Sequence, residues 1–524
     1  MAGLVVNAPD GTARHRSDGF YKWVCPDKLL WPQSRQTRTL LHNSTHLETG
    51  LSLRDQSNQD TYKPLDIPGS DMTRYATKMA EPMRLPSRED RETALKEAGF
   101  NVFNLNSEDV FIDLLTDSGT GTMSADQWAS LMRGDEAYAG STSFHELQAA
   151  VEETTGFEQV VPAHQGRGAE NVLYGLICDE GDVILNNTHF DTTRAHISNQ
   201  GADPIDCAVD AADDHDSDDP FKGNFSLEKG REIVDDVGAD AIPAVIVTIT
   251  NNSTAGQPVS TVNLRAVREF ADEIDAHFVI DACRFAENAY FTKRREDGYE
   301  DHSVVDIARE QLGLADAIVV SGKKDGIVNI GGFVAVREGV RAKGEDLFEL
   351  AKQRAILYEG FPTYGGMAGR DLAAMATGLK EAVEEAYVAD RVNQVEQLGT
   401  MLKEAGVPIY EPVGGHAVYI DAGQMLPHIP PEQFPGQSLV CELYREGGVR
   451  AVELGTLAFH DADRPEFVRL AVPRRKYHDE HLEHIVETAA AVLDRADELP
   501  GYEIVEEPVM PELRHFSAHL QPME

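Results

Sequence analysis

Short apolar runs and amphipathic stretches alternate through the middle of the chain. Four apolar runs predict buried strands: residues 244–250 (AVIVTIT), 277–282 (HFVIDA), 317–321 (AIVVS) and 331–337 (GGFVAVR). Apolar residues between Val262 and Ile274 recur at the spacing of one helix face, and residues 303–314 can form another helix. Strand–helix–strand repeats of this kind predict an α/β fold with a parallel sheet and right-handed crossovers.

Three polar residues follow or end these predicted strands. Asn252 comes just after the first strand, Asp281 lies at the end of the second, and Lys324 follows the third. Ligands of parallel sheets bind beyond the carboxyl ends of the strands. We therefore expect these three side chains to converge at one edge of the sheet.

Lys324 and Asp281 each admit two interpretations from their surroundings alone. A lysine that leaves a buried strand end can lose its proton more readily, as a Schiff-base nucleophile requires, but a solvated loop lysine is the commoner case. A buried aspartate needs a cationic partner, which is either the protonated pyridine nitrogen of a cofactor or Arg284 in a structural ion pair.

A glycine-rich segment, residues 164–171 (HQGRGAEN), opens a predicted helix. Gly166 and Gly168 allow backbone N–H groups to approach an anion, the helix N-terminus favours negative charge, and Arg167 adds donors. The spacing differs from a dinucleotide-binding fingerprint, whose third glycine and downstream acidic residue are missing. The segment is a candidate phosphate site, although glycine-rich turns before helices are common.

The charge of the chain restricts its partners and location. The 524 residues carry a formal net charge of −42, which opposes binding to nucleic acid and to anionic membranes. Such acidity without loss of hydrophobic residues is typical of a halophilic protein, in which salt screens the self-repulsion. No apolar run is long enough to span a bilayer, so we expect a cytoplasmic protein with five reduced cysteines.

Acidity also divides the chain. Residues 1–78 hold 10 Lys/Arg and 8 Asp/Glu, whereas the remainder holds 37 and 81, so we expect residues 1–78 to be an extension outside the fold. A helix capped by Ser87 and stopped by Gly99 then begins the ordered protein. Residues 203–219 hold eight aspartates and are predicted to be a solvated surface insertion rather than a calcium loop.

Eight segments resemble the β-eliminating lyases, the pyridoxal-phosphate (PLP) family that contains tryptophanase and tyrosine phenol-lyase. They occur in the family's order within residues 80–524, at 108–121, 134–141, 164–171, 255–260, 281–291, 321–333, 359–366 and 413–418. The resemblance implies the aspartate aminotransferase fold (fold type I). A large PLP-binding domain on a mainly parallel sheet would span residues 124–380, and a smaller α+β domain would combine residues 79–123 and 381–524.

The resemblance also implies roles for individual residues. Lys324 matches the Schiff-base lysine, Asp281 the partner of the pyridine nitrogen, and Phe190 the ring that stacks on PLP. The other expected cofactor contacts are the phosphate cradle of Gln165, Gly166, Arg167 and Ser321, the ring-oxygen neighbours Asn252 and Arg284, and Lys323.

Further matches concern the substrate and a cation. Arg469, helped by Thr116 and Ser118, matches the group that binds the substrate carboxylate. Tyr138 matches the proton donor to the leaving group, contributed across a subunit interface. The monovalent-cation site, which takes potassium in this family, corresponds to Gly119, Glu136 and Asn329. The family also implies a homotetramer with active sites at dimer interfaces.

The choice of substrate depends on what surrounds the aromatic ring. The tyrosine branch carries an arginine for the phenol oxygen where this chain has Leu454, while Asp191 and His515 resemble the tryptophan branch. Residues 321–333 read closer to the tyrosine branch. We expect cleavage of tryptophan to indole, pyruvate and ammonia, because a site built to bind a hydroxyl discriminates strongly. Tyrosine phenol-lyase is the alternative, and an aminotransferase or a non-enzymatic regulator that retains the cofactor is more distant.

Overall fold

The computed structural model describes residues 79–215, 217–459 and 465–523. The predicted extension, residues 1–78, lies outside the described residues. The chain from residue 79 begins as expected: helix α1 (Arg88–Glu97) has a capping box between Ser87 and Asp90. Gly99, with φ +63, follows the end of that helix.

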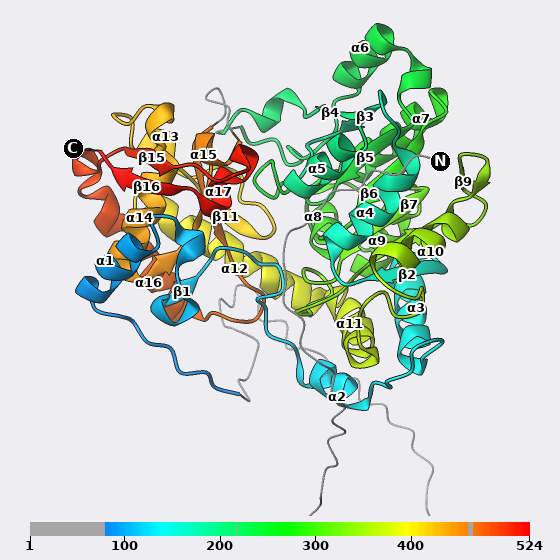
Figure 1. The fold of residues 1–524 in the computed structure, drawn as a ribbon, viewed down its shortest axis with the longest axis horizontal. Helices are drawn as coiled ribbons and strands as arrows, with labels where there is room; N and C mark the ends of the chain where they lie inside the picture. Colours follow the sequence, from blue (N-terminus) through cyan, green and yellow to red (C-terminus); the bar gives the residue numbers. More distant parts are fainter. Residues whose placement is uncertain (1–78, 216, 460–464, 524) are drawn as a thin grey trace, which may run out of the picture. The chain divides into compact units, whose positions relative to one another are not determined.

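A seven-stranded sheet forms the larger of the two main cores (Figure 1). Its strand order is β2-β8-β7-β6-β5-β3-β4. The strands are β2 (Gln159–Ala163), β3 (Val183–Asn186), β4 (Asp203–Asp206), β5 (Ala244–Thr248), β6 (His277–Asp281), β7 (Ala317–Ser321) and β8 (Gly332–Val336). Strands β4, β3, β5, β6 and β7 run parallel to one another, which confirms the predicted α/β fold.

Strand β8 is antiparallel to both of its neighbours, so the prediction of a parallel partner for residues 331–337 is wrong. A parallel neighbour requires a long crossover, and only ten residues separate the end of β7 from the start of β8. The chain therefore returns alongside β7 in the opposite direction.

Apolar residues alternate along the strands and cover both faces of the sheet. In β5, Val245 and Val247 belong to one cluster, and Ala244 and Ile246 belong to another. The first cluster includes residues of α3 (Thr142–Thr155), α7 (Thr261–Glu273), α8 (Phe285–Arg295), α9 (Val304–Leu312) and α11 (Gly369–Ala382). The second includes residues of α4 (Gly166–Ile177), α5 (Asp191–Asn199) and α10 (Leu347–Tyr358). The result is a three-layer arrangement of helices, sheet and helices.

The second main core brings together two distant parts of the chain. It contains Leu95 of α1 and residues from Val395 to Leu520, around the antiparallel sheet β11-β14-β13. These strands are β11 (Ala417–Asp421), β13 (Val452–Leu454) and β14 (Phe467–Ala471). The main helices here are α12 (Glu385–Glu404), α14 (Pro435–Gly447) and α16 (Asp479–Leu493). The predicted division into a large domain (124–380) and a smaller one (79–123 with 381–524) stays a prediction, boundaries included.

The acidic segment 203–219 is more ordered than the predicted surface insertion. Asp206 ends strand β4 and accepts hydrogen bonds from His189 and Arg194. His215 contacts Asp421 at 2.8 Å, and the Tyr410 hydroxyl donates to the carbonyl of Ala212. The exposed aspartates fit the predicted solvated surface segment: Asp203, Asp210, Asp213, Asp214, Asp218 and Asp219. The segment nevertheless contributes an edge strand and is anchored to residues 410–421.

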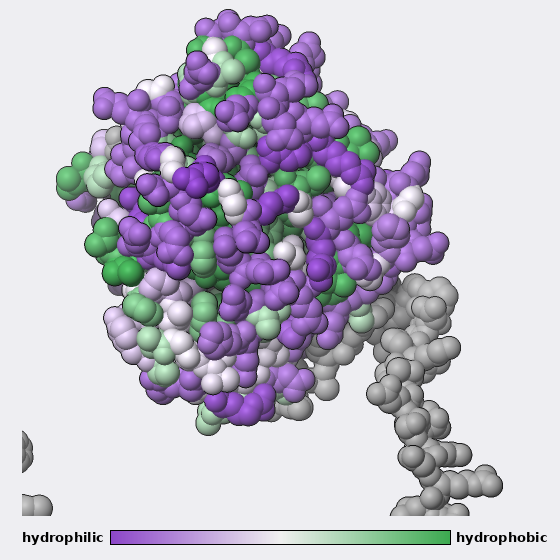
Figure 2. Space-filling model, turned by 90° about the vertical axis from the view of Figure 1, so that its right-hand side faces the viewer, coloured by the Kyte–Doolittle hydropathy of each residue, from purple (hydrophilic) through white to green (hydrophobic). Residues whose placement is uncertain are grey.

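Hydrophilic residues predominate on the face shown in Figure 2, and hydrophobic residues form separate groups between them. Among the described residues, no helix has both the length and the apolar character needed to cross a bilayer. The four described cysteines, Cys178, Cys207, Cys283 and Cys441, are buried free thiols.

Candidate active site

The loops that follow β6 and β7 meet at the carboxyl edge of the sheet. Asp281 is the last residue of β6 and aligns with Val319 of β7. The Ser321 N–H donates to the Cys283 sulfur at 3.2 Å, and the Asp325 N–H donates to the Cys283 carbonyl at 3.4 Å. These bonds hold the loop that carries Lys324 against the loop that follows Asp281.

An aromatic ring lies beside Lys324. The Lys324 Nζ is 5.7 Å from the centre of the Phe190 ring. Phe190 is the residue before helix α5, and its backbone carbonyl accepts the first hydrogen bond of that helix, from the Arg194 N–H. A flat ligand attached to Lys324 would therefore find an aromatic surface within reach.

The amino end of α4 lies against the end of β7. A Cβ atom on Gly166 would come 2.8 Å from the Cβ of Ser321, so only glycine allows this approach. Lys323 Nζ lies 3.5 Å from Oε1 of Gln165, and the pKa of Lys323 is lowered by burial and by the charges of Arg167 and Lys324. A helix N-terminus with several cationic side chains favours a phosphate group.

Asp281 is buried and accepts a hydrogen bond from the Cys283 N–H at 3.2 Å. Arg284 does not provide its counter-charge. Instead, Arg284 donates to both oxygens of Asp117, at 3.1 and 2.8 Å. The alternative of an Asp281–Arg284 ion pair is therefore wrong, and the carboxylate of Asp281 remains suited to a cationic ligand atom.

Sequence reasoning missed Glu170, a second buried acid near Lys324. Its carboxyl accepts hydrogen bonds from the hydroxyls of Thr192 and Thr193, each at 2.6 Å. Burial and the charge of Asp281 raise its pKa to about 7, while Lys324 acts in the opposite direction. The available signal was its position in an otherwise apolar face of the predicted helix, four residues after Gly166.

These groups match the chemistry of PLP at each part of the molecule. The amine of Lys324 can form an imine with its aldehyde, Phe190 offers a stacking surface, and the buried carboxylate of Asp281 suits a protonated pyridine nitrogen. The close approach of Gly166 to Ser321 brings the amino end of α4 to the end of β7, where the positive end of the helix suits a phosphate. The residues present therefore fit this cofactor.

Arg469 of β14 lies next to this group of residues. It donates to the carbonyl of Leu115 at 3.1 Å and to Oδ1 of Asn252 at 3.4 Å. Its buried Nε has no hydrogen-bond partner among the described residues. The Ser118 N–H donates to Oγ1 of Thr116 at 3.1 Å, in the segment that follows Leu115. The fold thus brings Arg469, Asn252 and residues 115–118 together, as a carboxylate-binding site would require.

The pKa values of His515 and Asp191 respond to the charged residues of this region. His515 is buried, and burial together with the charge of Arg469 lowers its pKa to about 3. Asp191 begins helix α5, where burial raises its pKa and Arg167, Arg469 and Lys324 oppose that effect. Both side chains are thus close enough to Arg469 to interact with it electrostatically.

Tyr138 and part of the predicted cation site are less closely associated with the residues around Lys324. Tyr138 is 70% exposed, and its ring contacts Tyr364 and Phe361. Asn329 donates to the carbonyl of Gly119 at 2.9 Å, whereas Glu136 pairs with Arg370 at 2.6 Å. The fold thus brings Gly119 and Asn329 of the predicted cation site together. Glu136, the third predicted member, forms its ion pair with Arg370 in a single chain.

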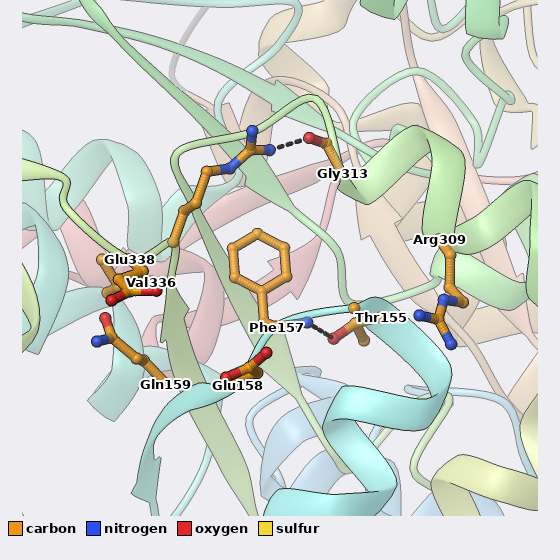
Figure 3. Close-up of a pocket in the computed structure, with 10 residues that line it drawn as sticks. Thr155, Phe157, Glu158, Gln159, Arg309, Gly313, Val336 and Glu338 are labelled. Carbon is orange, nitrogen blue, oxygen red and sulfur yellow. Dashed lines mark hydrogen bonds between the residues drawn. The ribbon is translucent and has the colours of Figure 1, made fainter.

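A cavity of about 500 Å³ lies at the opposite edge of the sheet. Its lining includes Gln159 at the start of β2, Val336 at the end of β8, and Phe157, whose ring is central in Figure 3. Val336 aligns with Ala317, the first residue of β7. The length of β7 therefore separates this cavity from the residues around Lys324.

Comparison with known proteins decides the family. The sequence profile described as "Beta-eliminating lyase" matches residues 113–488. The chain belongs to the β-eliminating lyase family. It is 63% identical to a protein named "Probable tryptophanase" from Halobacterium salinarum, over 86% of this chain and 100% of that protein. It is 50% identical to a "Tryptophanase" from Salinibacter ruber, over 86% and 95% of the two chains. It is 46% identical to a "Tyrosine phenol-lyase" from Symbiobacterium, over 86% and 98%.

Solved structures confirm the predicted fold class of this β-eliminating lyase. A serine palmitoyltransferase from Sphingomonas wittichii matches with a TM-score of 0.52 and 13% identity, over 74% of this chain and 88% of that one. An aspartate aminotransferase from Thermotoga maritima matches with a TM-score of 0.53 and 15% identity, over 78% and 95%. The fold is that of the PLP enzymes of fold type I, and PLP is the cofactor implied by the family.

Proposed function

We propose that this lyase cleaves L-tryptophan to indole, pyruvate and ammonia, with PLP bound to Lys324. The observation that carries the choice of tryptophan is the environment of Leu454. Leu454 aligns with Phe467 on the same sheet in which Val452 aligns with Arg469, and both Leu454 and Phe467 pack against an apolar cluster that includes Tyr419. An apolar side chain here offers no hydrogen bond to a phenol oxygen.

The comparisons support the same choice. Relatives named "Probable tryptophanase" and "Tryptophanase" are 63% and 50% identical to this chain, and a relative named "Tyrosine phenol-lyase" is 46% identical. Tyrosine phenol-lyase activity therefore remains the second candidate, and the resemblance of residues 321–333 to that branch favours it. An aminotransferase would need a keto-acid acceptor and would produce neither indole nor phenol.

Each residue of the candidate active site has its own role toward the substrate. Arg469, with Thr116 and Ser118, binds and orients the substrate carboxylate. When bound, PLP supplies a protonated pyridine ring that draws electron density from the substrate Cα. Asp281 would keep that nitrogen protonated, and Lys324, once released from PLP by the substrate amine, would remove the Cα proton.

The leaving group then needs a proton, because indole leaves poorly as an anion. Tyr138 would donate this proton to the C3 carbon of the indole ring, from across a subunit interface. Its 70% exposure in a single chain supports such a position. Asp191 and His515 would orient the ring. The homotetramer, the potassium ion at Gly119, Glu136 and Asn329, and the cytoplasmic location remain predictions.

Product analysis tests the proposal directly. The protein is incubated separately with tryptophan and with tyrosine in buffer rich in potassium chloride, without any keto acid, and indole, phenol and pyruvate are measured. We expect indole and pyruvate from tryptophan. Phenol from tyrosine at a higher kcat/KM would transfer the assignment to tyrosine phenol-lyase.

The attachment point of PLP is tested separately. Borohydride reduction of the PLP-loaded protein, followed by peptide mass mapping, should label Lys324. The neighbouring lysine provides a matched control. The Lys323→Met variant should still carry the label on Lys324, whereas the Lys324→Met variant should carry no label. Label on any other side chain would refute the assignment of Lys324.

A further inference from the structure

A fully buried arginine, Arg474, joins three separate segments of the chain. Its guanidinium donates to Asp117 at 2.8 Å, to Glu287 at 2.6 Å and to Asp325 at 3.0 Å. The Arg474 side chain is 1% exposed, and the three acids are 3% exposed or less. One buried charge thus contacts three carboxylates from positions far apart in the sequence.

Two of these carboxylates lie beside residues of the candidate active site. Asp117 stands between Thr116 and Ser118, which are assigned to the substrate carboxylate. Asp325 follows Lys324 directly, and its other oxygen accepts the Ala286 N–H of helix α8 at 2.7 Å. Arg474 therefore links the segment beside the substrate to the loop that carries Lys324.

The backbone of Arg474 strengthens this link. The Thr122 N–H donates to the Arg474 carbonyl at 2.9 Å, and a Cβ on Gly121 would lie 3.0 Å from that carbonyl oxygen. Gly119 N–H donates to the Lys323 carbonyl at 2.7 Å, so residues 116–122 contact both Arg474 and the Lys324 loop. The position of each loop depends on the other.

The wider network is balanced in charge. Arg284 pairs with Asp117, and Arg391 of α12 pairs with Glu287 at 3.1 Å, so three arginines meet three carboxylates. Buried ion networks often contribute no more stability than well-packed apolar residues would, because desolvation offsets the attraction. Stability alone therefore does not account for a network at this location.

We propose that Arg474 is a positioning residue, which sets the Lys324 loop and residues 116–118 in register by binding Asp325 and Asp117 at once. This inference rests on the proposed function, because it assumes that Lys324 holds PLP and that Thr116 and Ser118 meet the substrate. Among the described residues, the Arg474 side chain donates to Asp117, Glu287 and Asp325 and not to Lys324, Thr116 or Ser118. Its effect passes through the two aspartates.

Arg391 provides a matched control. Its side chain is as buried as that of Arg474 and belongs to the same network, but it contacts Glu287 and the carbonyl of His416, not Asp117 or Asp325. Arg474→Met and Arg391→Met each leave one carboxylate charge unbalanced in the interior. Both variants should therefore lose thermal stability, whereas only Arg474→Met should disturb the two loops.

The experiment compares wild type, Arg474→Met and Arg391→Met as full-length, PLP-loaded proteins at a temperature where circular dichroism shows all three folded. The equilibrium dissociation constant of PLP is measured by its absorbance, and kcat and KM are measured for tryptophan. We expect Arg474→Met to bind PLP more weakly and to lose roughly 100-fold in kcat/KM, because small displacements of reacting groups have effects of that size. Arg391→Met should match wild type in both properties.

Equal losses of PLP affinity in the two variants would overturn the inference, since the role of Arg474 would then be structural only. If Arg474→Met fails to fold, Asp325→Asn replaces it: this substitution weakens one of the contacts of Arg474 and keeps the other two. Asp325→Asn should weaken PLP binding, and unchanged affinity would also overturn the inference. Failure of the proposed function is distinguishable, because wild type itself would then fail to bind PLP at Lys324 or fail to release indole from tryptophan.

Discussion

His515 Nε2 lies 3.7 Å from Glu453 Oε2, and both side chains are buried. Neither atom has a hydrogen-bond partner in the described structure. Burial and the neighbouring Glu466 raise the pKa of Glu453 to about 8, and burial lowers the pKa of His515 to about 3. Near neutral pH the acid therefore holds a proton and the histidine does not.

This pair predicts a dependence of stability on pH. Between pH 4.5, where Glu453 ionises in the unfolded chain, and about pH 8, the folded protein retains a proton that the unfolded chain releases. The free energy of unfolding contributed by Glu453 therefore falls as the pH rises through this window. Glu453→Gln should become more stable relative to wild type by roughly 2–4 kcal/mol between pH 5 and pH 8.

Urea unfolding of both proteins at pH 5 and pH 8, in the same salt, measures this difference. His515 contributes in a separate window: its stabilising effect is lost as the pH falls from 6.5 towards 3, because the unfolded chain then takes up a proton. A constant difference between Glu453→Gln and wild type across the two pH values would show that Glu453 is ionised in the folded protein.

Because α4 approaches β7 closely, adding a single methyl group at Gly166 should weaken PLP binding. Gly166→Ala would place a Cβ 2.8 Å from the Cβ of Ser321 and would displace the helix end from the loop. We expect PLP affinity to fall by about tenfold or more, because the phosphate loses aligned N–H donors. Titration with PLP, followed by absorbance, measures this affinity. Ala169→Gly in the same helix is the control for general helix destabilisation. Wild-type affinity in Gly166→Ala would contradict the phosphate site.

Removing the Arg469 guanidinium should weaken catalysis on the substrate without weakening PLP binding. Arg469→Met removes the donor group that faces Leu115 and Asn252. A hydrogen bond to a charged group contributes about 1.5–3 kcal/mol, so kcat/KM for tryptophan should fall by roughly 10- to 150-fold. PLP affinity should remain that of wild type, because Arg469 is assigned to the substrate. An equal fall in PLP affinity would place Arg469 with the cofactor instead.

The net charge of −42 predicts stabilisation by salt. The Debye length falls from about 10 Å at 0.1 M to about 3 Å at 1 M, so self-repulsion weakens as salt is added. The melting temperature should rise steadily between these concentrations and beyond. Sodium chloride and potassium chloride should act alike on stability, whereas activity should need potassium. A melting temperature independent of salt would contradict the prediction of a halophilic protein.

Part of the site was accessible from local sequence. Asn252, Asp281 and Lys324 follow or end apolar strands, and parallel strands present their carboxyl ends at one edge. Short-range periodicity therefore sufficed to place them. The antiparallel course of residues 332–336 was missed because the pattern of a buried strand is the same in either direction.

The pairing of buried charges was not accessible. Arg284 lies three residues from Asp281 yet pairs with Asp117, which is 167 positions away in the chain. The apolar helix face around Glu170 indicated burial, but its raised pKa, like that of Glu453, also depends on a neighbouring carboxylate that only the fold supplies. Such effects depend on which elements pack together.

The sequence by itself determined the alternation of strands and helices, the family, and the strand ends at which Lys324 and Asp281 lie. Only the tertiary structure decided that Arg474 binds Asp117, Glu287 and Asp325, and that His515 faces Glu453. The physical reason is the separation in sequence over which each kind of interaction acts. Strand and helix patterns arise between residues a few positions apart, whereas a buried charge takes its partner and its pKa from whatever the fold brings within a few ångströms.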